Sequence, residues 1–175
     1  ATSVDLLTWQ KQPGNPIAAA DPRWYQTLAA GFTNEPFRDP WVFKLPGQQE
    51  WTMMTTAAAI DATNQQQRGV MGVSKSVDLV NWQVQPPAGS AGQGFGETEV
   101  FQFEIVDGVP ILLFCCGPIW LSEARRNSGE LGGVYSLPVA ADLSDVDFTR
   151  ATLFPDTKLY ASRLVQGQDG GWNLI

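Results

Sequence analysis

The decapeptide SVDLLTWQKQ at residues 3–12 returns as SVDLVNWQVQ at residues 76–85, with seven of the ten positions identical. A degenerate third copy, ADLSDVDF at residues 141–148, carries Phe148 in the place of the tryptophan. Repetition at a long period indicates that one supersecondary unit is used several times. Because Ser and Asp side chains accept hydrogen bonds from nearby backbone amides, they favour turns. The repeat therefore predicts that each unit ends in the same capped turn.

Short apolar or alternating runs lie between the copies and are separated by Gly, Pro, Asn and Asp. Turn signals at this spacing predict an all-β meander. The expected strands are 41–44, 51–56, 69–74, 101–105, 109–116 and 133–139, with a polar loop over 61–68. Three or four strands followed by the decapeptide, whose tryptophan starts the outer strand, are typical of a β-propeller blade.

The number of units predicts how much of a propeller the chain contains. Two full units run from about 37 to 85 and from about 97 to 150, and another begins at 159–165. A propeller protects its strand edges by closing a ring, and these units are too few to close a ring of five. We therefore expect residues 1–175 to form a partial propeller of roughly three blades: the end of blade 1, blades 2 and 3, and the start of blade 4.

The composition excludes several classes of function. The formal net charge is −7, and an acidic chain without a basic stripe suits neither nucleic acid nor an anionic membrane surface. No apolar run approaches the roughly 20 residues that a membrane helix needs. Because the chain has no histidine, it cannot use Ser-His-Asp or Cys-His catalysis or an imidazole zinc site. We expect carboxylates to carry any chemistry, without a metal or another cofactor.

The two cysteines, Cys115 and Cys116, are adjacent in an expected strand. Neighbours on a strand point to opposite faces, so we expect two free thiols and no disulfide. The cysteines leave open whether the protein is secreted or cytoplasmic.

Two acidic stretches occupy equivalent places in successive units: RDP at 38–40 and GETEV at 96–100. The first strand of each propeller blade lines the central channel, so carboxylates of neighbouring blades would converge at its mouth. Glycoside hydrolysis needs such a group, with one carboxyl as the acid and other carboxylates facing the sugar. An arginine beside an aspartate keeps that carboxylate charged and offers a donor to sugar hydroxyls. Either stretch alone also fits an ordinary turn or strand start, but their matched positions favour a site.

Four motifs in order resemble glycoside hydrolase families 32 and 68, the group of invertases, levanases, inulinases and fructosyltransferases. FRDP at 37–40 resembles the Arg-Asp-Pro motif of this group, and EVFQ at 99–102 resembles the motif that carries its acid/base glutamate. Ser-x-Asp-Leu-x-x-Trp is typical of its blade ends, and DTKLYA at 156–161 resembles an element of its fourth blade. The resemblance implies a five-bladed β-propeller that acts on β-fructosides such as sucrose, inulin or levan by a retaining mechanism.

The resemblance also implies roles for single residues. Glu99 would be the general acid/base, and Asp39 would stabilise the transition state by holding fructose hydroxyls. Arg38 would position those hydroxyls and the carboxyls, and Tyr160 would lie near Glu99 and tune it. Glu97 remains a rival for the acid role.

That rivalry arises because Val100 and Phe101 replace the cysteine and proline that usually follow the family's glutamate. Tryptophans near these motifs, Trp41 among them, are candidates for stacking on a sugar ring, with inter-blade packing as the alternative.

The family's nucleophile is absent from the sequence. It is an aspartate on blade one in an Asn-Asp-Pro-Asn type of motif, which nothing before Ser3 can supply and which Asn15-Pro16 does not match. We therefore expect the segment to be inactive alone, with the other blades coming from the rest of the protein or from another chain. Alternatives are a fructosyltransferase, a carbohydrate-binding relative without catalysis, and a propeller that binds proteins.

Overall fold

The structure is a computed structural model, which describes residues 1–11, 13–156 and 158–175. Two positions that enter the sequence motifs, Gln12 at the end of the first repeat copy and Thr157 in the fourth-blade element, lie outside the described residues.

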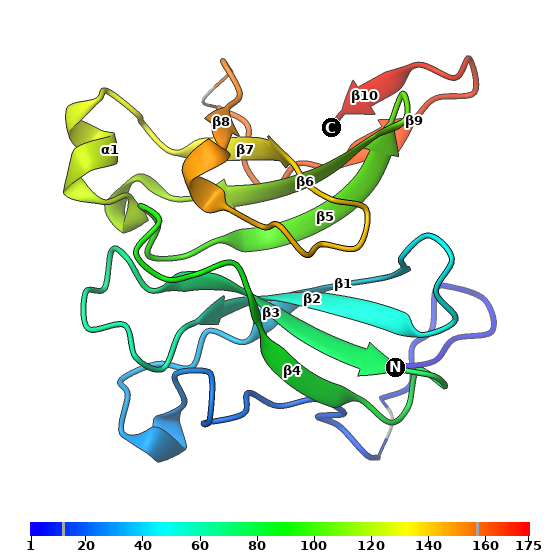
Figure 1. The fold of residues 1–175 in the computed structure, drawn as a ribbon. Helices are drawn as coiled ribbons and strands as arrows, with labels where there is room; N and C mark the ends of the chain where they lie inside the picture. The colour runs from blue at the N-terminus through cyan, green and yellow to red at the C-terminus, as the bar shows by residue number, and fades with distance from the viewer. Residues whose placement is uncertain (12, 157) are drawn as a thin grey trace.

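Two four-stranded antiparallel sheets, one above the other in Figure 1, make up most of the fold. The first has the order β1-β2-β3-β4, with β1 (Arg38–Lys44), β2 (Trp51–Ala58), β3 (Gly69–Ser76) and β4 (Gln83–Ala88). The second has the order β5-β6-β7-β8, with β5 (Glu99–Val106), β6 (Val109–Cys116), β7 (Gly133–Pro138) and β8 (Thr152–Leu153). A sheet in which sequential strands are neighbours is a meander, so the predicted all-β blades are confirmed.

The remaining elements are short. β9 (Leu164–Gln166) pairs with β10 (Trp172–Leu174), and this pair begins later than the strand expected at 159–165. The helical segments are η1 (Leu28–Ala30), η2 (Pro118–Trp120), α1 (Glu123–Asn127) and η3 (Phe148–Arg150). No sheet among the described strands closes on itself, which agrees with a partial propeller. No helix in the described ranges is long and apolar enough to cross a membrane.

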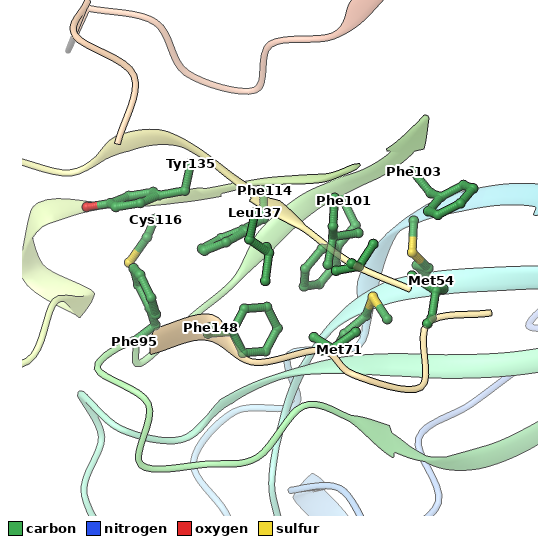
Figure 2. Close-up of a cluster of buried hydrophobic side chains, with 14 of the residues drawn as sticks. Met54, Met71, Phe95, Phe101, Phe103, Phe114, Cys116, Tyr135, Leu137 and Phe148 are labelled. Atoms are coloured by element: carbon green, nitrogen blue, oxygen red, sulfur yellow. The ribbon is translucent and has the colours of Figure 1, made fainter. Parts of the chain in front are cut away.

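Aromatic side chains fill the space between the two sheets (Figure 2). Phe114 stacks on Tyr135 with ring centroids 5.3 Å apart, and Phe95 meets both rings edge-on at 5.1 and 5.0 Å. The first sheet contributes Met54 and Met71, which are fully buried. Because burying one large apolar side chain is worth roughly 1.5–3 kcal/mol, this core joins the two blades firmly.

The repeated decapeptide forms the same turn twice. Ser76 Oγ accepts a hydrogen bond from the amide of Leu79 at 2.9 Å, and Asp78 Oδ1 accepts from Val80 and Asn81 at 2.9 and 2.7 Å. In the first copy, Ser3 and Asp5 accept hydrogen bonds from the amides of residues 6, 7 and 8 in the same pattern. The predicted capped turn is therefore confirmed in both copies.

The third copy keeps the backbone of this turn but not its tryptophan position. Leu143 has φ 62°, against 61° for Leu6 and 65° for Leu79. Three residues after this leucine, where the first two copies have tryptophan, the third copy has Val146. Phe148 was expected there, but it lies two residues further on, in η3, and is fully buried against Phe95, Phe101 and Phe114.

The two cysteines are free and buried, as the strand pattern predicts. Burial raises the pKa of both thiols. Such thiols react poorly, because the thiolate is the reactive form.

Candidate active site

The same backbone irregularity recurs near the start of β1, near the start of β5 and shortly before β9. Asp39, Val100 and Ala161 have φ values of 57°, 55° and 55°, in the left-handed region that side chains other than glycine seldom adopt. The pairing of β1 with β2 and of β5 with β6 shifts register at the first two of these positions. A bulge of this kind re-aims the neighbouring side chains and is common beside active sites.

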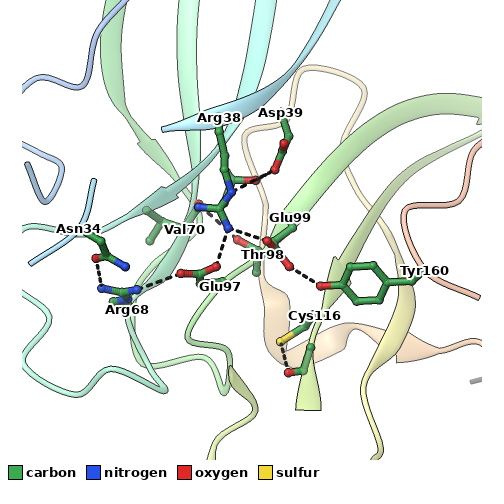
Figure 3. Close-up of polar contacts among 12 residues, drawn as sticks. Asn34, Arg38, Asp39, Arg68, Val70, Glu97, Thr98, Glu99, Cys116 and Tyr160 are labelled. Carbon is green, nitrogen blue, oxygen red and sulfur yellow. Dashed lines mark hydrogen bonds and ion pairs between the residues drawn. The ribbon is translucent and has the colours of Figure 1, made fainter. Parts of the chain in front are cut away.

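The residues that precede these three positions are Arg38, Glu99 and Tyr160, at intervals of 61 residues. Because the units repeat, the three side chains emerge at equivalent places and meet. Figure 3 shows Arg38 and Tyr160 on either side of Glu99.

Arg38 lies at the centre of three carboxylates. Its Nη2 donates hydrogen bonds to Glu97 Oε2 and to Glu99 Oε1, both at 2.6 Å. Its Nε lies 3.5 Å from Asp39 Oδ2. Burial alone would lower the pKa of Arg38, but the hydrogen bonds to the two glutamates raise it. One guanidinium therefore gathers the carboxylates of two blades.

Glu99 is partnered on both oxygens and still reaches the surface. Tyr160 Oη donates a hydrogen bond to Glu99 Oε2, and Arg38 Nη2 donates one to Glu99 Oε1. Burial and the hydrogen bond to Glu99 raise the pKa of Tyr160, so this phenol keeps its proton. The Glu99 side chain is 16% exposed, which leaves it accessible to a bound molecule.

Glu97 has a different environment. Its side chain is 5% exposed and lies between Arg68 Nη2 at 2.9 Å and Arg38 Nη2 at 2.6 Å. An acid that serves a substrate must come within hydrogen-bond distance of it. Of the two rivals for that role, Glu99 has the more accessible carboxylate and Glu97 is enclosed by cations.

Asp39 accepts a hydrogen bond from Thr56 Oγ1 at 3.0 Å and stays partly exposed beside Arg38. The threonine comes from β2, so the neighbouring strand fixes the direction of this carboxylate.

Five of the six side chains singled out from the sequence thus lie in one network: Arg38, Asp39, Glu97, Glu99 and Tyr160. Trp41 has its contacts elsewhere. Its ring lies under the guanidinium of Arg163 at 5.0 Å and lines a groove of about 610 Å³ together with Lys44 and Trp172.

Sequence reasoning missed Arg68. Arg68 ends the polar loop predicted over 61–68, and its fully buried side chain binds Glu97. The available signal was its position directly before the apolar run 69–73, which becomes a buried strand. No group of three or more His, Cys, Asp or Glu side chains in the described part of the chain is placed to hold a metal ion.

Comparisons with solved structures found several proteins with a similar fold. Inulosucrase from Halalkalicoccus jeotgali bound to kestose superposes with a TM-score of 0.62 at 17% identity, over 80% of this chain and 38% of that one. The β-fructofuranosidase catalytic domain of Microbacterium saccharophilum K-1 gives 0.55 at 23% identity, over 74% and 34%. The Bombyx mori GH32 β-fructofuranosidase BmSUC1 gives 0.57 at 19% identity, over 91% and 31%.

The chain therefore spans about a third of the length of these enzymes. A search of curated proteins found no match. The model of the glycosyl hydrolases family 32 N-terminal domain matches residues 1–137, which is most of the sequence. On this match the chain belongs to glycosyl hydrolases family 32.

Proposed function

We propose that this chain is part of a glycoside hydrolase that cleaves β-fructosides of the sucrose, inulin or levan type. The observation that carries the proposal is the contact of Arg38 with Asp39, Glu97 and Glu99, which brings carboxylates of two blades together. The family match supports it. Further support comes from the structural neighbours, one described as bound to kestose and another, a BmSUC1 variant, as in complex with sucrose.

In this proposal Glu99 is the general acid/base. It donates its proton to the glycosidic oxygen as the bond to the fructosyl carbon breaks, so the leaving sugar departs as a neutral alcohol. Tyr160 and Arg38 hold the two oxygens of Glu99 and aim its carboxyl group. Asp39 accepts hydrogen bonds from fructose hydroxyls, which strengthen as positive charge develops on the ring.

A retaining mechanism also needs a second carboxylate that attacks the fructosyl carbon and forms a covalent intermediate. We assign this nucleophile to a segment outside residues 1–175, on a blade that completes the propeller. Glu99 then removes a proton from water, whose oxygen displaces the nucleophile, and the acid form is restored. If a sugar hydroxyl takes the place of water, the same cycle transfers fructose instead of hydrolysing it.

The test measures fructose release from sucrose, inulin and levan by the protein that carries this segment. Glu99→Gln should lower kcat about 10²–10⁴-fold, because the neutral amide cannot donate the proton. Glu104→Gln is the matched control, since Glu104 lies on the same strand outside the network. Residues 1–175 alone should release no fructose.

If the protein binds sugar but cleaves no fructoside, the proposal fails and the protein is a carbohydrate-binding relative without catalysis. Full activity of Glu99→Gln would refute the assigned acid/base. The ratio of transferred to hydrolysed fructose, measured on sucrose, separates a hydrolase from a fructosyltransferase.

A further inference from the structure

Arg68 is a fully buried charge that the proposed mechanism does not use. Its side chain is 1% exposed, and its guanidinium lies 5.1 Å over the ring of Trp120. Nη1 donates to Asn34 Oδ1 at 2.8 Å and to Gln26 Oε1 at 3.2 Å, and Nη2 donates to Glu97 Oε1 at 2.9 Å. Three separate segments of the chain thus fix this one side chain.

Stability alone is a poor reason for this arrangement. Removing two charges from water costs several kcal/mol for each ion, and apolar residues of similar size often stabilise a core equally well. The Nε atom of Arg68 is buried with no hydrogen-bond partner within the described ranges, which adds to the cost. A rigid, forked cation is however well suited to fixing the direction of a carboxylate.

The contacts of Glu97 show which direction is fixed. Arg68 holds Oε1, while Oε2 accepts from Nη2 of Arg38, and that same Nη2 donates to Glu99 (Figure 3). A rotation of Glu97 would therefore displace the guanidinium that holds Glu99. We infer that Arg68 is a positioning residue, which keeps Glu99 in place through Glu97 and Arg38.

The catalytic consequence of this inference rests on the proposed function, but its geometric core does not. The pKa of Tyr160 reports the position of Glu99. The hydrogen bond that the Tyr160 hydroxyl donates to the Glu99 carboxylate contributes to the raised pKa of the tyrosine. Since the chain has three tyrosines, carbon-13 labelling of tyrosine gives three ring signals, which single Tyr→Phe variants assign. The titration of the Tyr160 signal is then a readout independent of enzyme activity.

The variant is Arg68→Lys, which keeps the charge but loses the fork that spans Glu97, Asn34 and Gln26. We expect the Tyr160 midpoint to move down toward the ordinary tyrosine value of about 10. Arg125→Lys is the matched control. Arg125 is also largely buried, binds Glu130 at 2.9 Å and lies 4.0 Å over the ring of Phe95, away from the network.

The control should leave the Tyr160 midpoint in place and move that of Tyr135, whose hydroxyl donates to Glu130. An unchanged Tyr160 midpoint in Arg68→Lys, or an equal movement in both variants, would overturn the inference. If Arg68→Lys does not fold, Asn34→Ala replaces it. That substitution, at an exposed residue, removes the oxygen that accepts a hydrogen bond from Arg68 Nη1. It should also lower the Tyr160 midpoint, by a smaller amount.

A double-mutant cycle tests the route through Glu97. In a Glu97→Ala background the link to Arg38 is already broken, because no side-chain oxygen remains to accept hydrogen bonds from Arg38 and Arg68. Arg68→Lys should then have no further effect on the Tyr160 midpoint, which is a non-additive result. Additive shifts would show that Arg68 acts by another route and would contradict the inference.

Enzyme kinetics separate this inference from the proposed function. If fructosides are cleaved, Arg68→Lys should lower kcat about tenfold or more with little change in KM, whereas Arg125→Lys should change neither. If no fructoside is cleaved but the Tyr160 midpoint moves as expected, the proposed function fails and the positioning role stands. If fructosides are cleaved and neither kcat nor the midpoint responds to Arg68→Lys, the positioning role fails and the proposed function stands.

Discussion

The guanidinium of Arg38 and the carboxylate of Glu99 meet at 2.6 Å across two different blades, although 61 residues separate them in the sequence. Both side chains stand next to a left-handed residue at the start of an inner strand. The ion pair thus depends on the repeat itself, since equivalent bulges in successive units turn the two groups toward each other. The blade-to-blade packing and the geometry of the candidate site are therefore coupled.

A substitution at Asp39 should separate the backbone requirement from the chemical one. Asn tolerates the left-handed conformation, whereas a β-branched residue there costs about 1–2 kcal/mol or more. Asp39→Asn should therefore unfold at the same urea concentration as the wild type but lose about 10²-fold in kcat. Asp39→Val should lose both activity and stability. Urea unfolding and initial rates check this, and a fully active Asp39→Asn would contradict the role of the carboxylate.

The tyrosines predict the behaviour of the protein in alkali. Burial raises the pKa of Tyr25 to about 12, and it also raises those of Tyr135 and Tyr160, which hydrogen-bond to Glu130 and Glu99. Since the folded pKa values lie above the unfolded value, this stabilisation is complete below about pH 10 and is lost as pH rises through the folded values. Ultraviolet titration of the folded protein should show little tyrosinate at pH 10, with the three midpoints above that pH. In urea, all three should titrate near that pH.

The core between the blades predicts a large loss of stability for Phe148→Ala. Phe148 is fully buried and contacts three other phenylalanines. Removing such a ring costs about 3–5 kcal/mol. Phe32→Ala, at a partly exposed position outside this core, is the control and should cost much less. Urea denaturation compares the two, and a loss of under about 1 kcal/mol in Phe148→Ala would show that the ring does not join the blades.

The repeated turn predicts a dependence on acid. Hydrogen bonds from backbone amides and from Asn81 lower the pKa of Asp78, and similar bonds lower that of Asp5 to about 2. Because the folded values lie below the unfolded ones, the stabilisation is present above about pH 4 and is lost as pH falls through the folded values. Asp78→Ala should therefore lower the urea midpoint at neutral pH and have less effect at pH 2. An Asp61→Ala control, at an exposed loop position, should show no such difference.

The fold was largely readable from the sequence because its signals are local. The Asp107-Gly108 pair has positive φ at both residues and joins β5 to β6, as a short Asp-Gly segment between apolar runs predicts. The Ser-x-Asp-Leu turn likewise closes on its own amides. Each pattern specifies its hydrogen-bond partners within a few residues.

The error at Arg68 arose where long-range packing decides. Arg68 binds side chains from residues 26, 34 and 97, and no local pattern indicates that these segments meet around it. The error at Phe148 is of another kind: this residue follows Leu143 by five positions and not by the three that separate Leu79 from Trp82, and its ring packs in the inter-blade core. The network around Arg38 was anticipated from the charged residues at the same position in two units and from the family resemblance, which alone indicated Tyr160.

The most direct test of the account compares Glu97→Gln with Glu99→Gln on two substrates, sucrose and an aryl β-fructoside whose leaving group needs no proton. If Glu99 is the acid, Glu99→Gln should lower kcat on sucrose about 10²–10⁴-fold. Formation of the fructosyl-enzyme from the aryl fructoside should slow far less, because that leaving group needs no proton. Glu97→Gln should show the same dependence on the leaving group to a smaller degree, because it disturbs Arg38, which holds Glu99. The opposite pattern, with leaving-group dependence in Glu97→Gln and none in Glu99→Gln, would contradict the assignment.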